Sequence, residues 1–236
     1  MLDDIRQFYE KTKLGEVIED DGTPWPITWK RVFHKEYPRL PSVPLPASKI
    51  NADFDSLLAQ RKATRIFSDN PLTLDEIGTI LRTYRIVDSN RDPERRTYPS
   101  AGARFPIELY LIAFNVAQID AGAYHYNIKR EILELLWKQQ LRPREKEIVS
   151  PYLENPAAAI VLTSVIARSE VKYGVKSYPY SLIEAGHVGQ NIQLGATSLG
   201  IGSCPVGGFV NDAIQKILDL TDDEIPVYVI GLGKTK

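Results

Sequence analysis

The spacing of apolar residues divides the chain into predicted helices and strands from residue 52 onward. Apolar positions recur with a helical period over residues 54–61, 73–84, 181–199 and 211–218. Shorter apolar runs predict strands over residues 108–116, 123–126, 132–137, 157–166 and 226–231. Because these elements do not alternate strictly, they predict an α+β fold with one central sheet covered by helices.

The first fifty residues have a different composition. Six prolines fall within residues 24–46, and such a density disfavours regular helix and predicts an extended, polyproline-like arm. The same stretch carries Trp25, Trp29, Phe33 and Tyr37, so we expect it to pack against a folded body, of its own chain or of a partner copy. The sequence therefore predicts an arm over residues 1–50 and a globular domain over residues 51–236.

Composition narrows the classes of function. The chain has 236 residues, of which 43% are hydrophobic, and a net charge of -1 at pH 7. Basic and acidic residues are interspersed, so we expect neither a nucleic-acid partner nor membrane binding. The single cysteine, Cys204, excludes a disulfide within the chain and suits a reducing cytoplasm, where we expect the protein to act. With only three histidines in the sequence, no metal site is expected.

Several common cofactor and nucleophile motifs are absent from the sequence. It contains no Gly-x-Gly-x-x-Gly, which argues against a Rossmann-type nicotinamide site, and no Gly-x-Ser-x-Gly nucleophile elbow. The last residues, Gly233-Lys234-Thr235, look like the end of a phosphate-binding P-loop. However, Tyr228 stands where that motif requires its first glycine.

Three segments could hold an anionic, planar cofactor. Arg61 and Arg65 are four residues apart and could clamp a phosphate, although a solvated charged turn is the alternative. The small residues over 99–103 could let backbone N–H groups approach a ligand, or could form an ordinary tight loop. Gly207 and Gly208 follow a predicted short strand and could point N–H groups at a ring edge, or could belong to a helix cap.

Lys172 beside Tyr173 could act as a general-base pair, whereas an accidental surface dipeptide is the alternative. Neighbours on a helix point about 100° apart, so both reach one substrate only at a helix end or in a turn. Gly174, directly after them, predicts such an end.

The helix predicted over residues 181–199 also carries polar residues at helical spacing: Glu184, His187, Gln190 and Asn191. These residues could line a binding site, or they could be polar groups of the core whose hydrogen bonds are made within the protein. The small residues near them, including Gly189, could allow the close approach of a second subunit. Cys204 is expected to be a small buried filler.

Taken in order, these segments resemble the SagB-type dehydrogenases, a branch of the nitroreductase superfamily that oxidises thiazolines and oxazolines in modified peptides. The resemblance runs from about Tyr37 to the C-terminus. The shared pieces are Tyr37-Pro38, Pro44-Leu45-Pro46, 61–67, 99–103, Glu108-Leu109-Tyr110, 122–126, Lys172-Tyr173, Ala185-Gly186-His187, Gln190-Asn191 and 204–209.

The resemblance implies a nitroreductase-like fold, with a mixed, mainly antiparallel sheet, and an intertwined homodimer that binds FMN where the subunits meet. It implies that FMN is held by Arg61, Lys62, Arg65, Pro99, Ser100, Ala101, Gly102, Gln190, Asn191, Pro205, Val206, Gly207, Gly208 and Lys234. The residues from Pro99 to Gly102 would come from the other subunit. Lys172 and Tyr173 would take a proton while hydride passes to the flavin N5. A peptide substrate and a peptide-modifying complex are the implied partners.

Two departures from the family pattern affect the expected substrate more than the cofactor. Ala63 stands where the family usually has serine, and Arg104-Phe105 replaces a Leu-Tyr pair at a point that could shape substrate entry. Two other functions stay open. One is an NAD(P)H-dependent nitroreductase or flavin reductase, and the other is a non-catalytic flavin-binding subunit of a peptide-modifying complex.

Overall fold

The computed structural model describes residues 7–8, 10–12, 26–46, 50, 52–139 and 152–236. The helices are α2 (Ile27–Lys30), α3 (Phe54–Gln60), α4 (Leu74–Leu81), α5 (Ala167–Tyr173), α6 (Ser177–Ser198) and α7 (Asn211–Leu218), with 3₁₀ turns η1 (Ala101–Ala103) and η2 (Gly174–Lys176). The strands are β1 (Ser42–Pro44), β2 (Ile86–Asp88), β3 (Arg95–Arg96), β4 (Ile107–Ala113), β5 (Gly122–Asn127), β6 (Ile132–Lys138), β7 (Ala158–Val165), β8 (Ile201–Val206) and β9 (Glu224–Lys234).

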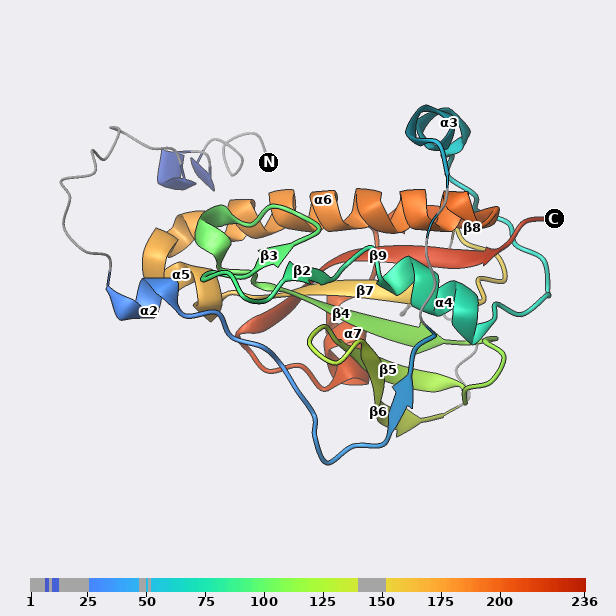
Figure 1. Ribbon diagram of the computed structural model, residues 1–236, viewed down its shortest axis with the longest axis horizontal. Helices are drawn as coiled ribbons and strands as arrows, with labels where there is room; N and C mark the ends of the chain where they lie inside the picture. The colour runs from blue at the N-terminus through green and yellow to red at the C-terminus, as the bar shows by residue number, and fades with distance from the viewer. Residues whose placement is uncertain (1–6, 9, 13–25, 47–49, 51, 140–151) are drawn as a thin grey trace.

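Seven strands form one sheet across the middle of the molecule (Figure 1). Their order is β1-β6-β5-β4-β7-β9-β8, and every neighbouring pair is antiparallel. β2 and β3 form a separate two-stranded sheet. The arrangement confirms the predicted α+β class, with an antiparallel sheet flanked by helices.

Alternate residues of the central strands face two different helical layers. Leu109 and Leu111 of β4 belong to the core beneath α4 and α6, whereas Tyr110 and Ile112 belong to the core that α7 covers. In Figure 1, α6 spans the length of one face of the sheet, and α7 lies on the other. All of β4 is buried, as expected for a strand that is covered on both sides.

Local sequence patterns predicted several of these boundaries well. The capping box of α4 is confirmed, because the Thr73 hydroxyl accepts from the Glu76 N–H at 3.2 Å and the Glu76 carboxylate accepts from the Thr73 N–H at 2.9 Å. The predicted hairpin is present as β5 and β6. α6 begins at Ser177, earlier than the predicted residue 181.

The proline-rich arm packs against the chain's own sheet. β1 pairs with β6 at the edge of the sheet. The Tyr37 N–H donates to the Glu134 carboxylate at 3.1 Å, and Lys35 forms an ion pair with the buried Glu224. The expectation that the proline-rich stretch holds no regular helix is wrong at one place: α2 begins directly after Pro26, where the missing proline N–H breaks no helical hydrogen bond.

A buried ionic network lies on the sheet face that the arm covers. The His125 ring contacts Glu108 at 3.0 Å and Glu134 at 2.9 Å, and Arg168 contacts the other oxygen of Glu108 at 2.5 Å. Burial opposes ionisation of Glu108, but Arg168 and His125 outweigh it and lower the pKa of Glu108 to about 2. These four groups satisfy one another, so we assign them to the stability of the fold.

Candidate functional site

A basic segment follows α3 and crosses the edge of the sheet near the C-terminus. The Thr64 N–H donates to the Ser203 carbonyl at 2.8 Å, which ties the segment to β8. Gly202 of β8 is needed for this contact, because an added Cβ would lie 2.8 Å from the Thr64 methyl group. The fold therefore fixes the position of the residues on either side of Thr64.

The cations of this segment have no acidic partner in the described part of the chain. Arg61 is half-buried and Lys62 and Arg65 are exposed, and none of them lies within ion-pair distance of a described carboxylate. Lys234 lies beside them at the end of β9. Its ammonium group, however, forms an ion pair with Glu76 of the capping box. The structure thus places the four cations that were predicted to bind the FMN phosphate in the same region, and one of them, Lys234, is already paired with Glu76.

β8 leads from the basic segment to the two consecutive glycines. Gly207 and Gly208 directly follow Val206 and are exposed, and a Cβ added to either would meet no described atom within 4 Å. Their backbone groups are therefore accessible to a ligand. Pro205 is half-buried, and Cys204 is buried, as predicted for a small filler. Burial raises the pKa of the Cys204 thiol, which does not favour a nucleophile.

Lys172 and Tyr173 are the last residues of α5, and Gly174 ends that helix with a φ of 53°. This is the helix end that both side chains need in order to reach one substrate. The Lys172 ammonium nitrogen lies 5.4 Å from the centroid of the Tyr173 ring. Burial and the nearby charge of Arg104 lower the pKa of Lys172, whereas burial raises the pKa of Tyr173. The direction at Lys172 is the one that a general base near neutral pH requires.

The glycine loop that precedes β4 lies against this pair. A Cβ added to Gly102 would lie 2.4 Å from the Tyr173 hydroxyl and 2.9 Å from the Lys172 ammonium nitrogen, so the ends of both side chains would have to move to admit a larger residue. Gly102, Ala103 and Phe105 have φ values of 56°, 52° and 48°. The left-handed region is unfavourable for residues that carry a Cβ, and such strain clusters at functional loops.

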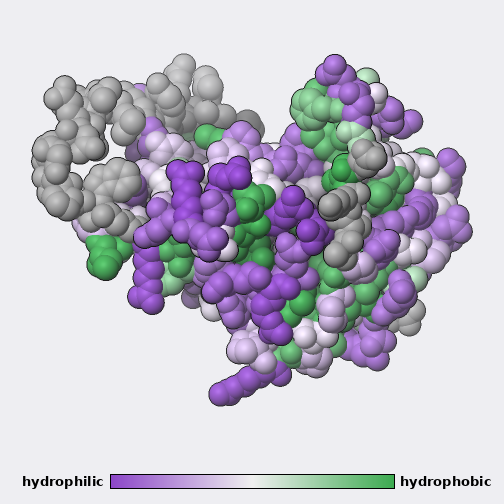
Figure 2. All heavy atoms as spheres, viewed as in Figure 1, coloured by the Kyte–Doolittle hydropathy of each residue, from purple (hydrophilic) through white to green (hydrophobic). Residues whose placement is uncertain are grey.

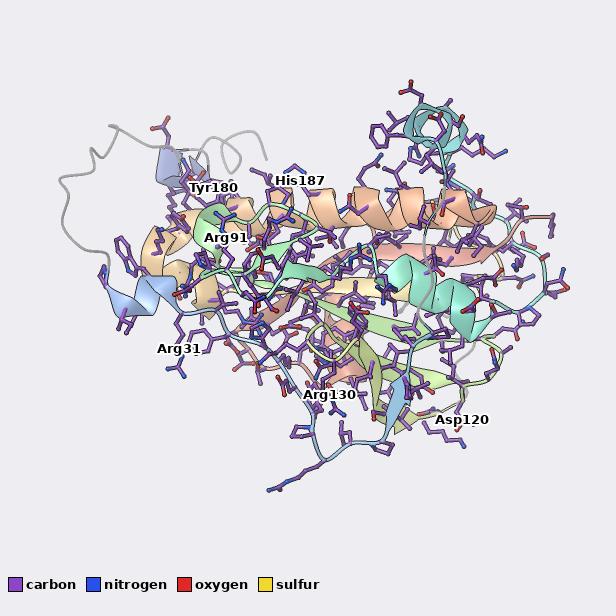
Figure 3. The ribbon with its side chains drawn as sticks, in the orientation of Figure 1. Arg31, Arg91, Asp120, Arg130, Tyr180 and His187 are labelled. Atoms are coloured by element: carbon purple, nitrogen blue, oxygen red, sulfur yellow. The ribbon has the colours of Figure 1, made fainter. Side chains whose placement is uncertain are left out.

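The polar residues of α6 differ in burial because they lie along the boundary between its inner and outer faces. Glu184 is buried, Gln190 and Asn191 are half-buried, and His187 is exposed and points away from the sheet (Figure 3). The Asn191 amide donates to the Thr97 carbonyl at 3.2 Å, which holds the chain beside β3 on the helix. Asn191 therefore already has a structural partner.

Glu184 is a buried acid that touches the glycine loop. It is 3% exposed, and its Oε1 has no hydrogen-bond partner in the described part of the chain. Burial raises the pKa of Glu184 to about 7, although the Ser100 hydroxyl and the charge of Arg96 oppose the shift. The small residue Gly189 serves the chain's own core rather than a second subunit, because an added Cβ would lie 2.6 Å from the Tyr228 ring.

Most of the predicted site residues fall into two groups at opposite ends of α6 (Figure 1). Gln190 and Asn191 lie within α6 between these groups, and Pro205, Val206, Gly207 and Gly208 lie at the far end of β8. The basic segment and Lys234 lie with the start of β8, directly after the C-terminal end of the helix. Lys172, Tyr173 and Gly102 lie at its N-terminal end. α6 has 22 residues, so at ~1.5 Å per residue its ends are about 33 Å apart. A single copy therefore keeps the two groups apart.

Both groups lie within one family match. The sequence profile of the Nitroreductase family matches residues 58–234. The chain belongs to the nitroreductase family. It is therefore a flavin-dependent oxidoreductase, and its antiparallel sheet with flanking helices is the nitroreductase fold.

Proteins similar to this nitroreductase have several described roles. The Methanocaldococcus jannaschii protein MJ1384, described as a nitroreductase, is 30% identical over 186 residues, which cover 76% of the chain and 90% of MJ1384. The trifolitoxin-processing protein TfxB of Rhizobium leguminosarum bv. trifolii is 28% identical, over 77% of the chain and 52% of TfxB. The microcin B17-processing protein McbC of Escherichia coli is 27% identical, over 60% and 56%. The chain thus spans about half the length of these two processing proteins.

Two further comparisons concern a reductase and a solved structure. The FMN reductase (NADPH) of Bacillus subtilis is 25% identical, over 78% of the chain and 66% of the reductase. A crystal structure of a nitroreductase-family protein from Anabaena variabilis superposes with a TM-score of 0.77 and 24% identity, over 98% of the chain and 47% of that protein. The structural likeness supports the fold. Within the described residues, no helix has both the length and the hydropathy needed to cross a bilayer.

Proposed function

We propose that this nitroreductase is an FMN-dependent dehydrogenase of the SagB type, which oxidises azoline rings in a peptide substrate. The observation that carries the proposal is the Lys172–Tyr173 pair at the end of α5, with the pKa of Lys172 lowered and Gly102 in close contact. The names of TfxB and McbC, which process trifolitoxin and microcin B17, support a substrate of this kind. They also support partners in a peptide-modifying complex.

The basic segment has the charge and the donors that the FMN phosphate requires. Arg61, Lys62 and Arg65 would bind it, because planar guanidinium groups pair well with phosphate oxygens. Lys234 would join them if it exchanges Glu76 for the phosphate. The remaining residues proposed to contact the cofactor are Pro99, Ser100, Ala101, Gly102, Gln190, Asn191, Pro205, Val206, Gly207 and Gly208. Bound FMN supplies the acceptor for a hydride equivalent.

The chain's own residues would handle the proton that the oxidation releases. Conversion of an azoline to an azole gives up one hydride equivalent and one proton from the ring. Neutral Lys172 would accept that proton, and the charge of Arg104 favours the neutral form by repulsion. Burial keeps Tyr173 protonated, so its hydroxyl would donate a hydrogen bond that orients the ring.

We infer that two copies build each site, because the two groups of residues lie at opposite ends of α6. Apolar side chains are exposed on the outer face of α6, at Leu182 and Ile183, and on α3, at Phe54 and Leu58. Figure 2 shows apolar side chains on α3, where this helix stands off from the rest of the surface. Exposed apolar patches of this kind are typical of subunit interfaces. A partner copy would bring Lys172 and Tyr173 to the FMN bound by the first.

A double variant, Lys172→Ala with Tyr173→Phe, tests the proposed chemistry. We expect the purified variant to bind FMN as wild type does, because neither residue belongs to the basic segment. Its oxidation of an azoline peptide should fall about 100-fold or more, the scale of lost general-base catalysis. Flavin reduction by dithionite, which takes no proton from carbon, is the control and should not change. Oxidation of the peptide at the wild-type rate would contradict the proposal.

A second candidate function is an NADPH-dependent flavin reductase, favoured by the similarity to the Bacillus subtilis FMN reductase. The two functions differ in the direction of electron flow. A dehydrogenase should keep its flavin oxidised when mixed anaerobically with NADPH, whereas a reductase should bleach it within one turnover. Rapid bleaching, followed by stopped-flow absorbance, would favour the second candidate.

A further inference from the structure

A cavity of about 890 Å³ lies between α2, the turn that joins β2 to β3, and α5. Three arginines line it: Arg31 directly after α2, Arg91 in the turn, and Arg104 next to α5. In Figure 3, Arg31 and Arg91 lie at the end of the molecule that carries α2, far from Asp120. The cavity is therefore distinct from the basic segment proposed to bind FMN, which lies at the other end of α6.

Arg104 is the unusual group of this cavity. Its side chain is 1% exposed, yet among the described residues it donates only to backbone carbonyls, of Arg168 at 2.6 Å and of Arg31 at 3.0 Å. None of the carboxylates in the described ranges lies within ion-pair distance of it. A guanidinium has five N–H donors, so most of the donors of Arg104 are not used by these two bonds. Buried charges are normally paired, which indicates that a ligand completes the set.

The acids around the cavity do not neutralise the arginines. Glu94 is engaged by Arg96 at 2.6 Å and by His34 at 2.9 Å. Asp92 is exposed and is the other acid of the lining. Three arginines therefore face one unengaged carboxylate, so the cavity carries a net positive charge. Apolar side chains from α2 and α5, including Ile27 and Val171, form the rest of the wall.

Arg104 also connects the cavity with the proposed catalytic pair. Its charge lowers the pKa of Lys172 and acts on Tyr173, so it lies close to both. Arg104 is also one of the positions at which the sequence departs from the SagB pattern. A ligand group bound to it would therefore lie beside the residues that take the proton.

We propose that this cavity binds a carboxylate-bearing side chain of the peptide substrate, held by Arg31, Arg91 and Arg104. That the bound peptide is a substrate rests on the proposed function. That the cavity binds an acidic peptide does not depend on the proposed function. The protein would then prefer azoline peptides with an aspartate or glutamate near the ring over neutral ones.

Calorimetric titration of the FMN-loaded full chain with blocked tetraglutamate and tetraglutamine peptides tests the inference. We expect the glutamate peptide to bind at low ionic strength and the glutamine peptide to bind at least about tenfold more weakly, as for one lost charged hydrogen bond. The double variant Arg31→Ala with Arg91→Ala should bind the glutamate peptide more weakly than wild type by a similar factor. Both residues are exposed, so the fold should tolerate the change.

Arg39→Ala with Arg130→Ala is the matched control, because it removes two exposed arginines that do not line the cavity. The control should bind the glutamate peptide as wild type does. Equal affinity for the two peptides, or unchanged affinity in the Arg31/Arg91 variant, would overturn the inference. Oxidation of a neutral azoline peptide is measured in parallel. If the wild-type protein does not oxidise this peptide, the result would contradict the proposed function alone and would not affect the conclusion about acidic-peptide binding.

Discussion

Two sets of charged residues in this nitroreductase have opposite surroundings. In the buried network, Glu108, His125, Glu134 and Arg168 each contact an opposite charge within 3.0 Å. In the basic segment, no described carboxylate lies within ion-pair distance of the cations. Burial makes an unpaired charge costly, whereas an exposed cation is well solvated without a partner. Charged residues that form ion pairs within the chain therefore stabilise the fold, whereas the exposed cations without such a pair are available to bind a ligand.

Removal of one member of the buried network should have the largest effect. Arg168→Ala leaves the buried Glu108 without its guanidinium, and breaking such a pair costs about 3–5 kcal/mol. We expect the free energy of unfolding, measured by urea titration, to fall by that amount. Arg65→Ala, the exposed counterpart, should change it by less than about 0.5 kcal/mol. Equal losses in the two variants would remove the distinction between the two sets.

The pH dependence of stability should identify Glu184 as a buried acid that forms no ion pair within the described part of the chain. Its pKa of about 7 in the folded protein exceeds the ordinary value of 4.5, so folding favours the protonated form. The stabilisation is complete below about pH 4.5 and is lost as the pH rises through about 7. Glu184→Gln stays neutral, so at about pH 9 its stability relative to wild type should exceed the value at about pH 4 by roughly 3 kcal/mol. Unfolding curves whose difference does not vary with pH would contradict this assignment.

The basic segment should affect the cofactor rather than the fold. Charged hydrogen bonds contribute about 1.5–3 kcal/mol, so Arg65→Ala should lower the affinity for FMN by roughly one to two orders of magnitude. Riboflavin lacks the phosphate and should bind the variant and wild type equally. Arg130→Ala, which removes an exposed arginine elsewhere, is the control in the same fluorescence titration. A parallel loss of riboflavin affinity would mean that Arg65 does not contact the phosphate.

Elements with local sequence patterns could be predicted, and those without such patterns could not. The Thr73–Glu76 capping box is defined by neighbours in sequence, and the structure confirms it. Only the end of α5 was predicted, from Gly174, because the seven residues of the helix carry no clear apolar period. The short helix α2 was missed because the prolines around it dominate the composition of the arm.

The sequence predicted candidate site residues but not how they are grouped. The contact between Gly102 and the Lys172–Tyr173 pair joins residues about 70 positions apart, and only the packing of α5 against the glycine loop produces it. The buried network was also missed. The sequence did carry a signal for this network, namely polar residues inside otherwise apolar strands. In the sheet these residues face one another, since His125 of β5 lies opposite Glu134 of β6 and beside Tyr110 of β4.

The most direct test of the central claim mixes two inactive variants in one preparation. One carries Arg61→Glu with Arg65→Glu in the basic segment, and the other carries Lys172→Ala with Tyr173→Phe. If each site takes the basic segment from one copy and the pair from its partner, a mixed dimer has one intact site and one doubly defective site. After dissociation and random reassociation, azoline oxidation should recover to roughly a quarter of the wild-type rate. Mixed preparations as inactive as each variant alone, with mixed dimers present by native mass spectrometry, would contradict a site shared between two copies.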